Sequence, residues 1–206
     1  MDDLLLLIIS SPSGAGKTTL TRRVLQQFPD LTFSVSHTTR PPRATEVDGK
    51  DYHFVDRNRF KEMVGASAFA EWAEVHANLY GTSVHELERA RAEGRHGLVF
   101  DVDYQGARQI KSKFREAICV FILPPSMEEL ERRLRSRASD DAESIARRFR
   151  KAREEIEHYP FFDYLIVNDD LAQAGAQLCG VVFAERCRKW RMSPHAEKLL
   201  RVETQA

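Results

Sequence analysis

The sequence predicts an α/β fold with a parallel core sheet that helices flank on both faces. Apolar runs of strand length recur along the chain, at residues 4–9, 97–101, 119–123 and 164–168. Each run is continuous rather than alternating, which is typical of parallel strands covered by helices on both sides. Each run also leads toward a polar or helical segment, which is the order of elements in α/β proteins.

The chain opens with a strand, a glycine-rich turn and a helix. Residues 4–9 form the apolar run, and residues 11–16, Ser-Pro-Ser-Gly-Ala-Gly, interrupt it. From residue 17 to residue 28 apolar side chains recur at helical spacing, and Pro29 ends the pattern.

The middle of the chain has two segments of different character. Between about residues 34 and 82, short alternating pieces around an Asp48-Gly49 turn predict a small insertion that contains a hairpin. Residues 127–158 are rich in Arg and Glu and have a helical pattern. No repeat and no break in composition marks a second independent domain.

Charge and composition argue against several classes of protein. Lys and Arg together number 31, as do Asp and Glu, so no net field attracts the chain to nucleic acid or to an anionic membrane. The longest apolar run follows Asp2 and Asp3 and is too short for a signal segment or a membrane span. Three cysteines form no Cys-x-x-Cys pair, which fits a reducing compartment. We expect a cytoplasmic protein whose partners are small molecules.

The turn after the first strand resembles a phosphate-binding loop. Residues 11–18 match the pattern G-x-x-x-x-G-K-S/T except that Ser11 replaces the first glycine. A loop between a buried strand and a helix directs backbone N–H groups and the positive helix end at one anion. We expect Lys17 to hold phosphate oxygens and the Thr18 hydroxyl to bind Mg²⁺. The alternative is a flexible glycine turn with a surface lysine.

Two carboxylates follow the second apolar run. Asp101 and Asp103 stand at the expected carboxyl end of a strand, where ligands bind in open α/β sheets. Strand alternation directs both to one side, so Asp101 is a candidate Mg²⁺ ligand and Asp103 a candidate contact to a second substrate. The alternative is a pair of solvated acidic residues.

Two arginines lie three residues apart in the predicted insertion. Arg40 and Arg43 flank two prolines that stiffen the chain. Each guanidinium offers a planar fork of donors, so the pair suits a phosphate. Two solvated arginines in a turn would give the same pattern.

Seven sequence blocks, in order from about residue 6 to residue 188, resemble guanylate kinase. They are Ser-Pro-Ser-Gly-Ala-Gly-Lys-Thr from residue 11, Ser-Val-Ser-His-Thr-Thr-Arg from 34, Glu-Trp-Ala-Glu-Val-His from 71, Asn-Leu-Tyr-Gly-Thr from 78, Asp-Val-Asp-Tyr-Gln-Gly from 101, Phe-Ile-Leu-Pro-Pro-Ser from 121 and Tyr-Leu-Ile-Val-Asn-Asp from 164.

The resemblance implies a P-loop nucleoside monophosphate kinase built as a single domain. Its core would comprise about residues 1–33, 83–126 and 159–206, with a GMP-binding α+β insertion at about 34–82 and a helical lid at about 127–158. The implied reaction transfers the γ-phosphoryl group of ATP to GMP, and to dGMP, with Mg²⁺ as cofactor. Its products are ADP and the nucleoside diphosphate.

The resemblance also implies site residues, which fall into four sets. For ATP they are Ser11, Pro12, Ser13, Gly14, Ala15, Gly16, Lys17, Thr18 and Thr19 of the loop, Arg135, Arg137 and Arg148 of the lid, and Asn168 near the adenine. For GMP they are Arg40, Arg43, Tyr52 and Tyr80 at the phosphate, with Ser36, Glu71, Thr82 and Asp103 at the guanine. The catalytic set is Lys17, Arg40, Arg137 and Arg148, and the metal set is Thr18 and Asp101.

The chemistry of guanine agrees with the role implied for Glu71. Guanine presents its N1–H and its N2 amine as adjacent donors, which one carboxylate accepts together, whereas adenine has an acceptor at N1. The lid departs from the family, because Ser136 and Ala138 stand where guanylate kinases often have glycine after each of the two arginines.

Two other functions share parts of this pattern. Guanylate-kinase-like domains of scaffold proteins bind peptides, but such a module is expected to lose the phosphate loop, which is intact here from Gly16 to Thr18. A phosphoryl transferase for sugar phosphates would share the loop, but it would not need Ser36 and Glu71 as a guanine-binding pair.

Overall fold

A five-stranded parallel sheet forms the centre of the computed structural model, which describes residues 4–75, 77–136 and 142–202. Its strand order is β2-β7-β1-β8-β9, and every neighbouring pair is parallel. The strands are β1 (Leu5–Ser10), β2 (Leu31–Phe33), β7 (Gly97–Asp101), β8 (Ile118–Leu123) and β9 (Tyr164–Val167). The predicted parallel sheet is confirmed, with β2 as a strand that the sequence did not reveal.

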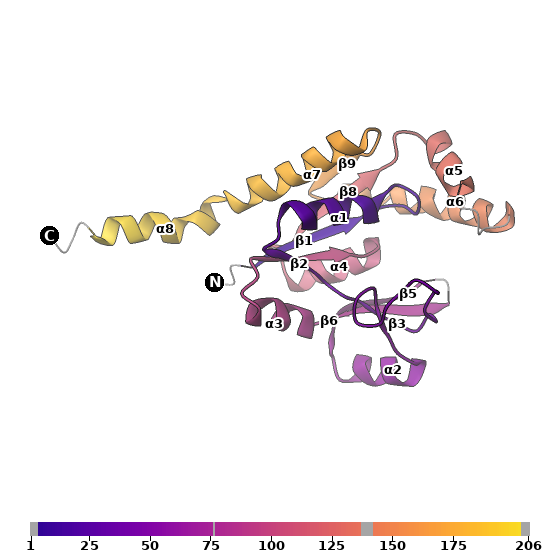
Figure 1. Cartoon of the computed structure of the whole chain (residues 1–206), viewed down its shortest axis with the longest axis horizontal. Helices are drawn as coiled ribbons and strands as arrows, with labels where there is room; N and C mark the ends of the chain where they lie inside the picture. Colours follow the sequence, from indigo (N-terminus) through magenta and orange to yellow (C-terminus); the bar gives the residue numbers. More distant parts are fainter. Residues whose placement is uncertain (1–3, 76, 137–141, 203–206) are drawn as a thin grey trace.

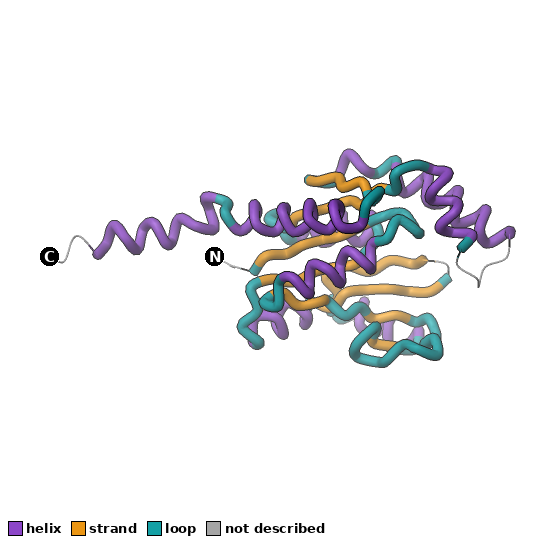
Figure 2. The backbone as a smooth tube through the Cα atoms, turned by 45° about the horizontal axis from the view of Figure 1, so that its top comes forward, coloured by secondary structure: helices purple, strands orange, loops and turns teal. Residues whose placement is uncertain are grey.

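Helices cover both faces of this sheet. The helices are α1 (Lys17–Gln27) and α7 (Leu171–Arg186) on one face, with α3 (His85–Ala92) and α4 (Tyr104–Lys113) on the other (Figures 1 and 2). Alternate residues of β1 divide between two buried clusters, so that Leu7 packs with α1 and α7 while Ile8 packs with α3 and α4. The continuous apolar pattern of β1 therefore follows from burial on both sides.

A second, four-stranded sheet with the order β4-β3-β6-β5 forms the insertion. Its elements are β3 (His37–Thr38), β4 (His53–Phe54), α2 (Arg57–Gly65), β5 (Phe69–Val75) and β6 (Asn78–Ser83). A small core of Phe60, Phe69 and Leu79 joins α2 to this sheet.

The insertion contains a hairpin, as predicted, but the expected position of that hairpin around Asp48-Gly49 is wrong. The antiparallel hairpin is β5–β6, whereas β4 pairs in parallel with β3. Gly49 lies in a tight turn with φ 74° and its N–H donates to the Tyr52 carbonyl at 2.8 Å. The turn of the β5–β6 hairpin has no Asn-Gly or Asp-Gly pair to mark it in the sequence. Ala77 instead has the positive φ there, at 61°.

Three helices complete the chain. They are α5 (Met127–Arg135), α6 (Ala142–Ile156) and α8 (Lys189–Val202), with a short 3₁₀ helix, η1 (Tyr159–Phe161), before β9. Leu130, Leu134 and Ala152 hold α5 against α6, while α8 extends past the end of α7 and away from the sheet (Figure 1). In the described parts of the chain, we find no helix with the length and apolar character needed to cross a membrane.

The first residue of β7 gives a test of the sheet. A Cβ on Gly97 would lie 2.5 Å from Leu31 Cδ2 and 2.7 Å from the Leu5 carbonyl oxygen. Overpacking of this kind costs roughly 1–3 kcal/mol, and we expect Gly97→Ala to lose that much in urea denaturation. Gly180→Ala is the matched control, because no atom lies within 4 Å of its added Cβ in α7. That variant should gain up to about 1 kcal/mol; equal losses in the two variants would contradict the close packing at β7.

Candidate functional site

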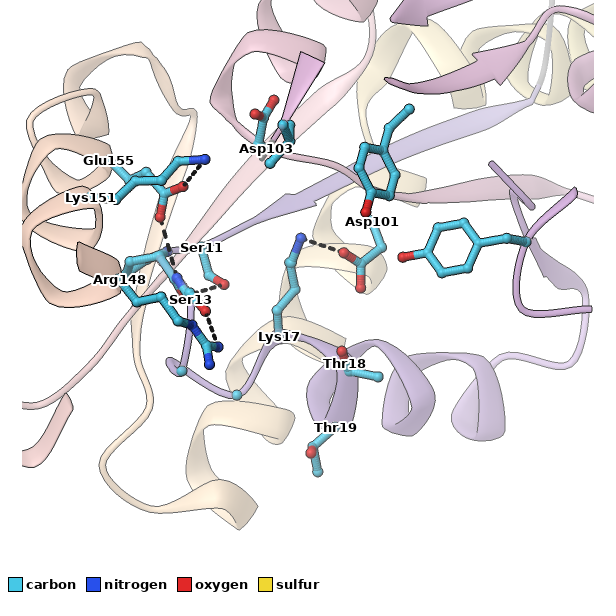
Figure 3. A pocket seen from close by; sticks show the side chains of 16 residues that line it. Ser11, Ser13, Lys17, Thr18, Thr19, Asp101, Asp103, Arg148, Lys151 and Glu155 are labelled. Atoms are coloured by element: carbon cyan, nitrogen blue, oxygen red, sulfur yellow. Dashed lines mark hydrogen bonds and ion pairs between the residues drawn. The ribbon is translucent and has the colours of Figure 1, made fainter. Parts of the chain in front are cut away.

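The loop between β1 and α1 has a backbone that requires glycine. Gly14 and Gly16 both have φ 95°, in the left-handed region that side chains disfavour. Gly16 is also the N-cap of α1 and has no side chain to cap the helix. The first N–H groups of α1 thus lie at a cavity lined by the loop, with the positive helix end behind them (Figure 3).

Asn168 supports this loop from behind. Its Nδ2 donates to the Ala15 carbonyl at 2.7 Å, and its side chain is buried. A Cβ on Gly16 would lie only 2.3 Å from that Nδ2, so the position of the Asn168 side chain leaves room only for glycine at residue 16. The sequence did not predict this hydrogen bond from Asn168 to the loop backbone. A contact between Asn168 and adenine stays a prediction.

Lys17 and Asp101 lie together at the centre of the site. The Lys17 ammonium is ion-paired with the Asp101 carboxylate at the end of β7 and donates to the Val102 carbonyl at 3.3 Å. Thr18 lines the same cavity from the first turn of α1 (Figure 3). The strand end and the helix start therefore place a cation, a carboxylate and a hydroxyl around one space, while their roles toward phosphate and Mg²⁺ stay predictions.

Helix α6 contacts the loop at Ser13. The Arg148 guanidinium donates to Ser13 Oγ at 2.7 Å, and the Ser13 N–H donates to Glu155 Oε2 at 3.3 Å (Figure 3). Lys151 Nζ lies 3.8 Å from Glu155 Oε1, and burial raises the pKa of Glu155. Lys151 and Glu155 were not predicted, although the spacing of 148, 151 and 155 along one helix face could have revealed them.

Arg135, the other predicted lid arginine among the described residues, pairs within α5 and not with the loop. Arg135 pairs with Glu131 at 2.6 Å and its side chain is 64% exposed. Arg137 and Ala138 lie outside the described residues. Ser136 ends α5, where its hydroxyl donates to the Arg133 carbonyl at 2.9 Å.

The Glu46 carboxylate, which was not among the predicted residues, holds the Arg40 guanidinium in place. Glu46 accepts two hydrogen bonds from Arg40 Nη2 at 2.8 and 2.9 Å, and this pairing lowers the pKa of Glu46. The Arg40 guanidinium carbon lies 5.4 Å from the centre of the Tyr52 ring, which is itself 6.0 Å from the Tyr80 ring. Arg43 is 76% exposed. Its Nη1 lies 3.9 Å from Glu46 Oε1, so Glu46 holds Arg40 closely and Arg43 more loosely. An acidic residue at short spacing after both arginines was the signal that could have revealed this pairing.

Glu71 is a buried carboxylate at the side of a second cavity. It is 4% exposed, and desolvation raises its pKa to about 7 although hydrogen bonds from Thr82 oppose the shift. Ser36 Oγ lies 3.1 Å from Thr82 Oγ1, which joins three of the predicted residues in one network. Asp103 lines the same cavity and caps α4, accepting from the N–H groups of residues 105 and 106 at 3.0 Å.

The two cavities meet at Lys17. One is lined by the loop and α6, the other by Ser36 and Glu71. The residues common to both are Lys17, Tyr52, Val75, Tyr80, Asp101 and Asp103. A molecule at the loop and a molecule at Glu71 would therefore face each other across one ammonium group.

The oxygen donors at this junction fit Mg²⁺. Thr18 supplies a hydroxyl and Asp101 a carboxylate, both of which are hard ligands. Within the described ranges, no group of three His, Cys, Asp or Glu residues could hold a metal ion. One hydroxyl and one carboxylate are a donor set that Mg²⁺ can use, because it commonly binds one or two protein oxygens together with substrate phosphates and water.

Comparison with known proteins gives one consistent result. The family model described as guanylate kinase matches residues 4–185. A guanylate kinase of Geobacter metallireducens is 52% identical over 187 residues, 91% of this chain and 92% of its own length. One of Syntrophotalea carbinolica is 50% identical over 201 residues, 98% of this chain and 95% of its own. The crystal structure of guanylate kinase from Anaplasma phagocytophilum has a TM-score of 0.76 and 33% identity, covering 93% of this chain and 90% of its own.

The raised pKa of Glu71 makes the stability of the protein depend on pH. Between its ordinary value of 4.5 and about 7, the unfolded chain releases this proton while the folded chain keeps it. Wild-type stability therefore falls with rising pH in that window relative to Glu71→Gln, which carries no charge. We expect the variant to be more stable by on the order of 2 kcal/mol at pH 8 and to show no such gain at pH 4.5. Denaturation of both proteins at the two pH values measures this, and a gain that does not change with pH would contradict the assignment.

Proposed function

The chain belongs to the guanylate kinase family, and we propose that it transfers the γ-phosphoryl group of ATP to GMP, and to dGMP. The observation that carries this proposal is the junction at Lys17 between the loop cavity and the Glu71 cavity. Two substrates bound there would have their reacting phosphates side by side. Holding them in that geometry removes much of the entropic barrier to transfer.

We assign the ATP phosphates to the loop from Ser11 to Thr19. The amides at the start of α1 and the Lys17 ammonium supply donors for an anion. Arg148 already contacts the loop through Ser13, which supports its assignment to the transferring phosphate. Arg135 and Arg137 are proposed as further phosphate ligands from the lid.

We assign the GMP phosphate to Arg40, Arg43, Tyr52 and Tyr80. The pairing of Arg40 with Glu46 supports this, because a guanidinium already fixed in place loses less side-chain entropy on binding. Glu71 would accept both donor groups of the guanine edge, assisted by the other guanine-cavity residues, which are Ser36, Thr82 and Asp103. Adenine would leave the buried carboxylate facing an acceptor, so AMP is expected to bind poorly.

Thr18 and Asp101 are the residues that would hold Mg²⁺. When bound, Mg²⁺ supplies positive charge to the phosphate oxygens of ATP. Lys17 would exchange Asp101 for phosphate oxygens, which frees that carboxylate for the metal.

The chain's own residues supply charge and position rather than a nucleophile. The transferring phosphoryl group spreads negative charge over its oxygens, and Lys17, Arg40, Arg137 and Arg148 would stabilise that charge. The GMP phosphate is already an anion, so it needs no strong general base. Contact of α6 with the loop supports a further role in excluding water from the reacting phosphates.

Removal of the Lys17 ammonium should separate chemistry from acceptor binding. We expect Lys17→Ala to lose nearly all turnover, measured as ADP release in a coupled assay, because the charge at the junction is gone. GMP affinity should stay near wild type by calorimetry, since Arg40 and Arg43 belong to the insertion. Lys61→Ala on exposed α2 is the control and should behave as wild type. Wild-type turnover in Lys17→Ala would contradict the mechanism.

Glu71 should govern the choice of base. Glu71→Gln replaces a charge-assisted acceptor by an amide, and we expect it to weaken GMP binding by on the order of 2 kcal/mol at pH 8. Discrimination against AMP should fall, and ATP affinity should not change. The gap between wild type and variant should close below about pH 7, where the wild-type carboxyl is protonated. Equal GMP affinities at pH 8 by calorimetry would refute the guanine assignment.

A panel of ligands distinguishes the other two functions. Thermal shift with GMP, AMP, UMP and ribose phosphates should show stabilisation by GMP above the rest. Stabilisation by ribose phosphates instead would favour a sugar-phosphate kinase. The absence of any shift with nucleotides would favour a peptide-binding module.

A further inference from the structure

Helix α4 of the core holds the outer edge of β5. In the four-stranded sheet β5 pairs only with β6, so its other edge has no strand beside it. The Gln109 side chain occupies that edge: its Oε1 accepts from the Trp72 N–H at 3.1 Å and its Nε2 donates to the Trp72 carbonyl at 2.8 Å. Four residues further along α4, Lys113 Nζ donates to the Phe69 carbonyl at 2.9 Å.

Gln109 takes the place of a missing strand. Its amide offers one acceptor and one donor, as a peptide group of a neighbouring strand would. Leucine has a similar size but neither group, and a glutamate carboxylate offers acceptors only. The pairing therefore depends on the amide rather than on bulk alone.

This contact bears on Glu71, which directly precedes Trp72. The ladder between β5 and β6 changes register between Phe69 and Glu71, so β6 alone fixes this stretch poorly. On the α4 side, a Cβ on Gly106 would lie 2.8 Å from Glu71 Oε2. Gly106, Gln109 and Lys113 thus form one face of α4 that makes room for the carboxylate and binds the backbone on both sides of it.

We propose that Gln109 is a positioning residue that sets the Glu71 carboxylate against the guanine site and so contributes to base selectivity. The inference rests on the proposed function, because it assigns Gln109 a role through Glu71. Gln109 itself is not among the residues that line the guanine cavity. Its effect is therefore expected on acceptor binding and not on the chemical step.

Gln109→Leu tests the proposal, with Lys111→Met as the matched control. Lys111 lies on the same helix, but it donates to the Ala117 carbonyl at 2.5 Å and pairs with Asp163 at 2.9 Å, away from β5. We expect Gln109→Leu to raise the Kd and KM for GMP roughly five- to twentyfold, from the loss of two hydrogen bonds. Its Kd for ATP and its kcat should stay within about twofold of wild type, and Lys111→Met should match wild type in both affinities.

Gln109→Glu gives a signature that a merely structural role would not produce. The ionised carboxylate of this variant faces the Trp72 carbonyl with a second acceptor, whereas its protonated form restores a donor beside an acceptor. The Kd for GMP of Gln109→Glu should therefore exceed that of Gln109→Leu at pH 8 and fall below it as the introduced carboxyl is protonated towards pH 5. The two variants are compared with each other because protonation of Glu71 reduces the effect of either substitution on GMP binding.

Each outcome decides one point. Unchanged GMP affinity in Gln109→Leu, or equal losses of GMP and ATP affinity in Gln109→Leu and Lys111→Met, overturns the positioning role and leaves the proposed function intact. Wild-type protein that binds and phosphorylates no GMP overturns the proposed function and the role of Gln109 with it. Thermal unfolding of every variant in the absence of ligand identifies global destabilisation, and Gln109→Glu then decides through its pH dependence.

Discussion

The left-handed turn through Gly14 and Gly16 is the constraint on which the rest of the site depends. It fixes where α1 begins, and hence where the first amides and Lys17 lie. Its surroundings leave no room for change, because a Cβ on Gly14 would meet Leu130 and Leu134 at 3.1 Å. The loop is thus the point at which the sheet, α1, α5 and α6 come together.

Two buried carboxylates show how burial can serve structure or ligand binding. Glu86 is 4% exposed, but it pairs with Arg89 at 2.9 Å and accepts from the Val35 N–H at 2.9 Å. Glu71 is equally buried, yet it faces a cavity and keeps a raised pKa. Glu86 has its charge partner within the fold, whereas the desolvated Glu71 carboxylate faces a cavity, which is the property that we expect of a binding residue.

Much of the core could be predicted because its signals are local. β1, α1 and β7 follow from continuous apolar runs and from glycine and proline at their ends, and the loop follows from its motif. β2 was missed because three residues carry too little pattern. The hairpin was misplaced because the left-handed residue at its turn is Ala77 rather than a glycine.

The side-chain contacts that could not be predicted join residues far apart in the chain. Asn168 is 153 residues from Ala15, and Glu155 is 142 residues from Ser13. Gln109 reaches Trp72 over 37 residues, and nothing in the local pattern distinguishes it from a solvated helix residue. Such contacts depend on how α4 packs on β5 and how α6 and Asn168 pack on the loop, which hydrophobic periodicity does not encode.

The central claim is that the two cavities bring donor and acceptor phosphates together at Lys17 for direct transfer, with no covalent intermediate on the protein. The stereochemical course of the reaction tests this most directly. With ATP made chiral at the γ-phosphorus and GMP as acceptor, one in-line displacement inverts the configuration at phosphorus in the GDP formed. The account predicts inversion; retention would require two displacements through a protein nucleophile and would contradict it.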